Sequence, residues 1–92
     1  MQFAKRLRER VRSGEITCSV RIWRNARVKP GGRHRLAPGF VVVESVTPIT
    51  LAHVTGELAR RSGFDGVVDL LKTARHGEGE QVFLVTFRYE EG

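Results

Sequence analysis

The sequence predicts an α+β domain in which a small, strongly bent mixed β-sheet approaches a barrel and two to three helices cover one side. Residues 16–23 and 81–89 have the alternation and apolar content of strands, whereas residues 3–11 and 51–74 place apolar side chains at helical spacing. Few helices separate the strands, so the edges of the sheet must be closed or covered. At 92 residues the chain forms a single domain, residues 1–92, with one modest core.

The first elements are a short helix and a strand. Phe3, Leu7 and Val11 recur every four residues among charged side chains, which predicts a helix that ends near Gly14. The strand over residues 16–23 has an apolar face and a face that is polar, basic and aromatic. These faces are Ile16, Cys18, Val20 and Ile22 on one side, and Thr17, Ser19, Arg21 and Trp23 on the other. We expect the apolar face to be buried and the second face to contact a ligand, and the sequence leaves open whether the first helix covers this second face.

Proline and glycine divide the middle of the chain. A turn at residues 30–32 precedes a short strand over residues 33–36, and a turn at residues 38–39 leads into a Val-rich strand over residues 40–46. Pro48 lacks an amide hydrogen, so we expect it to end that strand.

Two further helices and a final strand follow. Thr50 is the expected N-cap of a helix whose buried side begins at Leu51, and Asp65 is the expected cap of another helix that Gly77 ends. Residues 81–89 are largely apolar on both faces, which predicts a strand in the centre of the sheet.

Positive charge is concentrated in the first half of the chain. The net charge is +6, and residues 16–43 contain six Lys or Arg and no Asp or Glu, whereas residues 44–92 contain five bases and eight acids. The six bases are Arg21, Arg24, Arg27, Lys29, Arg33 and Arg35. A basic half joined to an acidic half gives the molecule a positive face, for which nucleic acid is the usual partner.

The chemistry of this segment predicts a surface that binds nucleic acid. Arginine guanidinium groups bind two phosphate oxygens at once, hydroxyl groups reach a ribose or a base edge, and Trp23 can stack on an unpaired base. Trp23 could equally complete the core, and the sequence leaves both roles open. The predicted binding residues are Thr17, Ser19, Arg21, Trp23, Arg24, Lys29, Arg33 and Arg35.

Other classes of function have little support in the sequence. The three histidines, His34, His53 and His76, have no metal-ligand spacing, so we expect no metal and no cofactor. The single cysteine cannot form an internal disulfide, and no apolar run reaches the length of a membrane span. We therefore expect a cytoplasmic monomer without a membrane partner.

The order of elements resembles the ASCH domain, a small β-barrel related to the PUA RNA-binding domain. The resemblance spans nearly the whole chain. It rests on Ser13-Gly14-Glu15-Ile16-Thr17 before a strand that carries Arg21, the glycine turn Lys29-Pro30-Gly31-Gly32-Arg33, the Val-rich strand and the closing strand over residues 82–89. The resemblance implies a PUA-like fold and a cleft beside the first strand that binds RNA or a modified nucleoside.

One branch of this family hydrolyses N4-acetylcytidine with a lysine, a threonine and a glutamate. Ile16 stands at the position of the lysine, Ser19 corresponds to the threonine, and the region of the acid is the basic Arg60-Arg61-Ser62, with Glu57 upstream. Without a lysine to activate a hydroxyl, we favour RNA binding without catalysis. The alternative is a hydrolase acting on an N4-acylcytidine-type nucleoside, or a ribonuclease, with Ser19 as its candidate catalytic residue.

Overall fold

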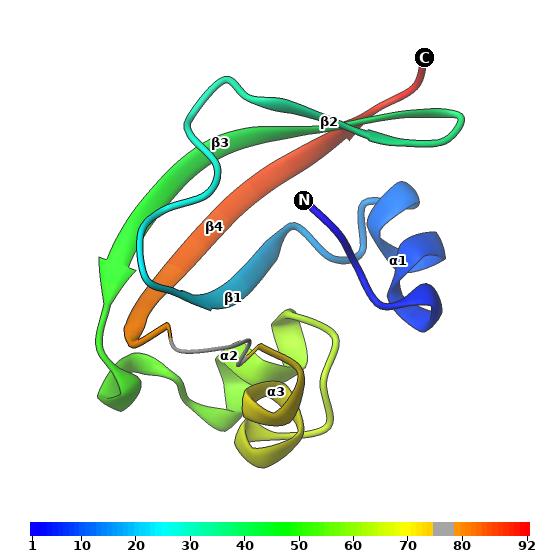
Figure 1. Cartoon of the computed structure of the whole chain (residues 1–92). Coiled ribbons are helices and arrows are strands. Elements are labelled where there is room, and N and C mark those ends of the chain that lie inside the picture. The colour runs from blue at the N-terminus through cyan, green and yellow to red at the C-terminus, as the bar shows by residue number, and fades with distance from the viewer. Residues whose placement is uncertain (75–78) are drawn as a thin grey trace.

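A computed structural model of the chain describes residues 1–74 and 79–92 (Figure 1). Four strands form one sheet: β1 (Cys18–Trp23), β2 (Arg33–Leu36), β3 (Gly39–Ile49) and β4 (Gln81–Glu90). The helical elements are η1 (Lys5–Leu7), α1 (Arg8–Arg12), η2 (Leu51–His53), α2 (Gly56–Arg61) and α3 (Val67–Ala74). The α+β class predicted from the sequence is therefore confirmed.

The sheet has the strand order β1-β4-β3-β2, and each of its three pairings is antiparallel, so the prediction of a mixed sheet was wrong. The strand β4 lies between β1 and β3, as its two apolar faces predict. The sheet curls into half of a barrel, and β1 and β2 form its two edges in the described part of the chain (Figure 1). The N-terminal segment and α1 lie across the space between these edges.

Pro48 does not end the third strand, in contrast to the prediction. The strand β3 continues to Ile49, and Pro48 lies opposite Phe83 of β4. The partner on the other side, β2, pairs only with residues 39–42 of β3. Beyond this point β3 is an edge strand on that side, where the missing amide hydrogen of a proline costs no ladder hydrogen bond.

The predicted helices form with changed boundaries. The N-terminal helix is a turn of 3-10 helix followed by α1, which ends at Arg12 with Ser13 as its C-cap, and Gly14 follows with a positive φ of 82°. The helix predicted from Thr50 is two elements, because Thr55 caps α2 separately by accepting a hydrogen bond from the Leu58 amide. Leu51 is consequently 58% exposed rather than buried. The predicted helix stop at Gly77 lies outside the described residues.

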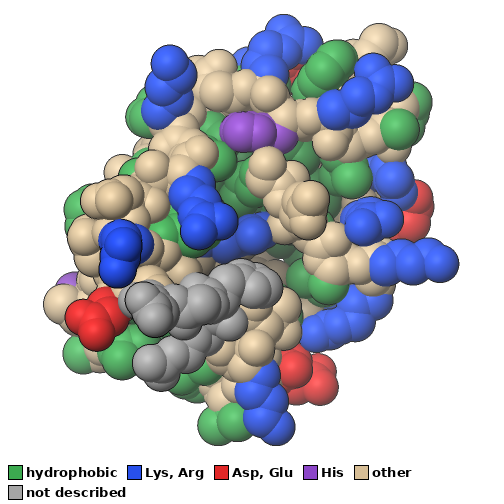
Figure 2. Space-filling view, viewed as in Figure 1, with side chains coloured by type: hydrophobic (Ala, Val, Ile, Leu, Met, Phe, Trp, Pro, Cys, Tyr) green, Lys and Arg blue, Asp and Glu red, His purple; other side chains and the backbone are tan. Residues whose placement is uncertain are grey.

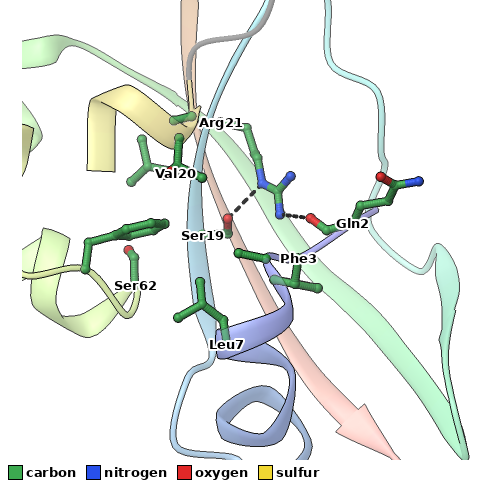
Figure 3. Close-up of a pocket in the computed structure, with 11 residues that line it drawn as sticks. Gln2, Phe3, Leu7, Ser19, Val20, Arg21 and Ser62 are labelled. Carbon is green, nitrogen blue, oxygen red and sulfur yellow. Dashed lines mark hydrogen bonds between the residues drawn. The ribbon is translucent and has the colours of Figure 1, made fainter. Parts of the chain in front are cut away.

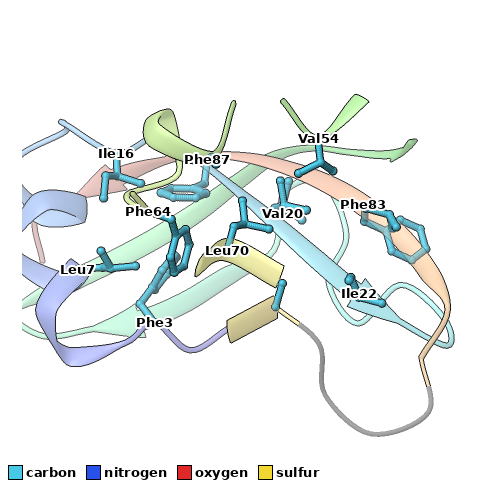
Figure 4. Close-up of a cluster of buried hydrophobic side chains, with 14 of the residues drawn as sticks. Phe3, Leu7, Ile16, Val20, Ile22, Val54, Phe64, Leu70, Phe83 and Phe87 are labelled. Atoms are coloured by element: carbon cyan, nitrogen blue, oxygen red, sulfur yellow. The ribbon is translucent and has the colours of Figure 1, made fainter. Parts of the chain in front are cut away.

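The core lies between the sheet and the helices (Figure 4). Phe87 of β4 is 1% exposed, and its ring makes an edge-to-face contact with Phe3 at a centroid distance of 5.3 Å. Phe3, Leu7 and Val11 are buried as predicted, but Phe3 lies before the first helical element rather than in a helix. Cys18 is also buried, with its Sγ 3.8 Å from Ser62 Oγ.

No helix in the described part of the chain is long and apolar enough to cross a membrane.

A single tyrosine ties the β2–β3 hairpin to β4. The Tyr89 hydroxyl accepts a hydrogen bond from the Gly39 amide at 2.7 Å and donates one to the Leu36 carbonyl at 2.9 Å. Gly39 must be a glycine here, because a Cβ would lie 2.0 Å from the Glu90 carbonyl oxygen.

We expect Tyr89→Phe to lower the free energy of unfolding by about 1–2 kcal/mol, because both hydrogen bonds are lost. Urea unfolding followed by circular dichroism measures this loss, and hydrogen exchange at the Gly39 amide reports it locally. Faster exchange at Gly39 with unchanged exchange in β1 is the expected pattern. An unchanged unfolding free energy would show that the hydroxyl does not hold the hairpin.

Candidate nucleic-acid interface

The second face of β1 is less open than the sequence predicts, because residues 2–4 pack beside it (Figure 3). Ser19 is 8% exposed, and its Oγ accepts a hydrogen bond from Arg21 Nε at 2.8 Å. Arg21 also donates to the Gln2 carbonyl oxygen at 2.6 Å, and its guanidinium carbon lies 5.2 Å from the centre of the Phe3 ring. Burial lowers the pKa of Arg21, and both groups that accept its hydrogen bonds, the Ser19 hydroxyl and the Gln2 carbonyl, are neutral. Arg21 therefore fixes the N-terminal segment against the strand.

The cavity beside β1 is small. It has a volume of about 40 Å³ and lies between the N-terminal segment, β1 and α3, with Phe3, Leu7, Ser19 and Phe64 among its lining residues. This volume holds a few water molecules and is too small for a nucleoside. The cleft that the family resemblance implies beside the first strand is thus filled by the protein's own N-terminal segment.

The structure places Trp23 in the core. Its side chain is 6% exposed, and its ring centroid lies 5.8 Å from that of Phe83. Gly79 lies against the Trp23 backbone, where a Cβ would come within 2.7 Å of the Trp23 carbonyl carbon. Of the two roles that the sequence leaves open for Trp23, the structure supports packing rather than base stacking.

Three of the remaining predicted basic residues, Lys29, Arg33 and Arg35, lie at the edge strand β2 or in the connection before it. Two adjoining hollows follow residues 32–37. The first, which we call the loop hollow, has a volume of about 310 Å³ and is lined by Ala26, Arg27, Val28, Lys29, Gly32, Arg33 and His34. The second, the N-terminal hollow, has a volume of about 380 Å³ and is lined by Met1, Gln2, Phe3, Arg8, Arg12, Arg35, Leu36 and Ala37. The strand β2 thus contributes to both hollows, with Arg33 and His34 at the loop hollow and Arg35 and Leu36 at the N-terminal hollow.

Arg33 and Arg35 project from the same face of β2 beside the ring of Phe40. Phe40 is the cross-strand partner of Arg35, and side chains two residues apart on a strand share a face. The guanidinium carbons of Arg33 and Arg35 lie 4.7 Å and 5.8 Å from the centre of the Phe40 ring. These distances are within the range of cation–π attraction, which holds both cations at the strand.

One carboxylate borders this group. Glu90 is the cross-strand partner of Phe40 on β4, and its carboxylate lies 3.5 Å from a guanidinium nitrogen of Arg33 and 2.6 Å from one of Arg88. The Arg33 side chain is nevertheless 55% exposed, so it is accessible to a ligand. Figure 2 shows Lys and Arg side chains over the upper part of the molecule, where the β1–β2 connection and β2 lie, and down the side formed by α1.

Sequence reasoning missed two arginines of α1, Arg8 and Arg12, and the aromatic ring of Phe40. Arg8 and Arg12 are four residues apart on one helix face and line the N-terminal hollow together with Arg35. Arg12 donates to the Ala37 carbonyl oxygen at 2.7 Å, which fixes α1 against the hairpin. Of the other predicted residues, Lys29 lines the loop hollow, whereas Thr17 and Arg24 are exposed and line neither hollow.

His34 faces the opposite side of β2 from its two arginine neighbours. Its Nδ1 lies 3.1 Å from the Met1 amino nitrogen, and its buried Nε2 has no hydrogen-bond partner among the described residues. Burial, followed by the nearby amino-terminal charge, lowers the pKa of His34. Both effects favour the neutral form of this histidine. Residues 1–74 and 79–92 contain no group of three or more His, Cys, Asp or Glu side chains that could hold a metal ion.

These features define a small α+β protein with a curled antiparallel sheet and a basic edge strand. Comparison with protein-family models, with curated proteins and with solved structures gives no match for this chain. The ASCH and PUA resemblance is therefore a hypothesis that depends on the motifs in the sequence.

Proposed function

We propose that this protein binds RNA through a basic strip along β2. The strip consists of Arg27, Lys29 and Arg33 at the loop hollow, and of Arg8, Arg12 and Arg35 at the N-terminal hollow. The observation that carries the proposal is that these six cations from three separate segments gather around one edge strand. Guanidinium groups with exposed donors bind phosphate oxygens, and a line of them matches a phosphate backbone better than it matches a single small anion.

The ASCH and PUA relationship belongs to the same proposal. An open, curled sheet with a helix at one side is compatible with a PUA-like domain, and both the resemblance and the charge distribution favour RNA as the polyanion. The proposed surface differs from the cleft that the family resemblance implies, because the N-terminal segment fills the space beside β1.

The hydrolase alternative gains no support from the residues around Ser19. Ser19 Oγ accepts a hydrogen bond from the Arg21 side chain, and a guanidinium group is a donor that cannot act as a base. In the described part of the chain no carboxylate or histidine is hydrogen-bonded to Ser19, and Ile16, at the position of the missing lysine, is 2% exposed in the core. We therefore do not propose a catalytic activity.

A salt titration tests the proposed function. A short labelled single-stranded RNA is titrated with the protein at salt concentrations from about 50 mM to about 300 mM, and the affinity is measured by fluorescence anisotropy. If four cations of the strip neutralise phosphates, the slope of log K against log salt is about −3, because each contact contributes about 0.7. Binding that is absent, or independent of salt, would overturn the proposal.

Removing the Glu90 carboxylate, which lies beside Arg33, should strengthen RNA binding. Glu90→Gln frees Arg33 from its acidic partner while preserving the shape of the side chain, so we expect the RNA affinity to rise roughly two- to fivefold at low salt. The gain should shrink as salt rises, because exposed charges are screened. Glu57→Gln on α2 removes the same charge from an exposed residue that does not line either hollow, and it serves as the matched control. Equal gains in both variants would indicate only an effect of net charge.

A further inference from the structure

We propose that the strip selects single-stranded RNA by stacking an unpaired base at Phe40, an inference that rests on the proposed function. Phe40 with Arg33 and Arg35 forms a unit that we call the Phe40 platform. Arg33 lines the loop hollow, Arg35 lines the N-terminal hollow, and the guanidinium carbons of both lie within 5.8 Å of the centre of the Phe40 ring. Each arginine of the platform thus lines one of the two basic hollows, whereas the Phe40 ring lines neither of them.

The chemistry of the platform suits a base better than a phosphate alone. Aromatic rings and guanidinium planes both stack on nucleobases, and such stacking does not depend strongly on sequence, because every base has a π face. Phe40 lies on β3 between β2 and β4 and is partly exposed, unlike Trp23 and Phe83, which pack against each other in the core. Phe40 is thus the aromatic side chain placed to meet a base beside the basic strip.

The flanking hollows supply the matching phosphate sites. A strand that crosses β2 can place one base on the platform and its neighbouring phosphates near Arg27 and Lys29 on one side and near Arg8 and Arg12 on the other. A duplex keeps its bases stacked inside the helix, so it can engage the cations but not the ring. Stacking on the platform therefore raises the affinity for single-stranded RNA but not the affinity for a duplex.

The test compares single-stranded RNA with a duplex of the same length at one salt concentration. We expect Phe40→Leu to weaken single-strand binding about fivefold or more, in line with the loss of one stacked base, and to leave duplex binding unchanged. The matched control is Phe64→Leu, because Phe64 also has a guanidinium over its ring, that of Arg6 at 5.3 Å, but lies beside α2 and α3. Circular dichroism of each variant verifies folding.

A second variant gives a direct signal. Phe40→Trp preserves an aromatic ring, so it should retain single-strand affinity, and the emission of the added indole should be quenched by single-stranded RNA but not by duplex. The native Trp23 is 6% exposed and provides a constant background. Unchanged single-strand affinity in Phe40→Leu, or an indole that RNA does not quench, would overturn the inference while the salt-dependent binding still supports the proposed function. Loss of salt-dependent binding to both RNA forms in the wild-type protein would instead overturn the proposed function.

Discussion

Replacing Arg33 and Arg35 together with alanine is expected to lower the RNA affinity roughly 50-fold at about 50 mM salt, since each neutralised phosphate contributes about 0.7 to the slope of log K against log salt. The slope itself should fall by about 1.4. The effect is large because both arginines project from one face of β2 and join the two hollows. Anisotropy titrations of the double variant over a range of salt concentrations measure both quantities.

The control for this experiment removes two positive charges from α2 instead of from β2. Arg60 and Arg61 are consecutive exposed residues of α2, which lies at the opposite end of the molecule from β2 (Figure 1). The variant Arg60→Ala with Arg61→Ala should retain most of the affinity and the slope. If both double variants lose the same affinity, the binding depends on the overall charge, and the basic strip is not the site.

Phe87→Ala is expected to lower the free energy of unfolding by about 3–5 kcal/mol, which is a large part of the total stability of a small domain. Phe87 is 1% exposed at the centre of the sheet and contacts Phe3. Its backbone amide also donates to the Thr17 carbonyl oxygen at 2.9 Å, so the residue lies where the N-terminal segment, β1 and β4 meet. Alanine would leave a cavity that these elements cannot fill without moving.

Urea denaturation followed by circular dichroism checks this value. Phe87→Leu retains most of the apolar volume and should cost less than the alanine variant. Val68 is 68% exposed on α3, so Val68→Ala should change stability by no more than about 0.5 kcal/mol. A loss below about 1 kcal/mol for Phe87→Ala would contradict the central position of this ring in the core.

Local sequence patterns determined the elements of this protein and their approximate order. Two apolar faces marked β4 as a central strand, and the spacing of Leu7 and Val11 identified the buried side of the first helical segment, whereas Phe3 is buried from the residues before it. These predictions succeeded because side-chain periodicity follows directly from backbone geometry. The boundaries near Pro48 and Thr55 could not be read in the same way, since they depend on which strand edge is paired and on which of two threonines caps a helix.

The sequence also determined which chemical groups the protein could offer to RNA, namely a basic run without acids. Only the tertiary structure decided which of them form a surface. A strand pattern shows that Ser19, Arg21 and Trp23 share a face, but it does not show that residues 2–4 pack beside this face. The grouping of Arg35 with Arg8 and Arg12 likewise depends on contacts between the hairpin and α1. The physical reason is that periodicity is local, whereas the covering of a face and the gathering of like charges result from packing between distant segments.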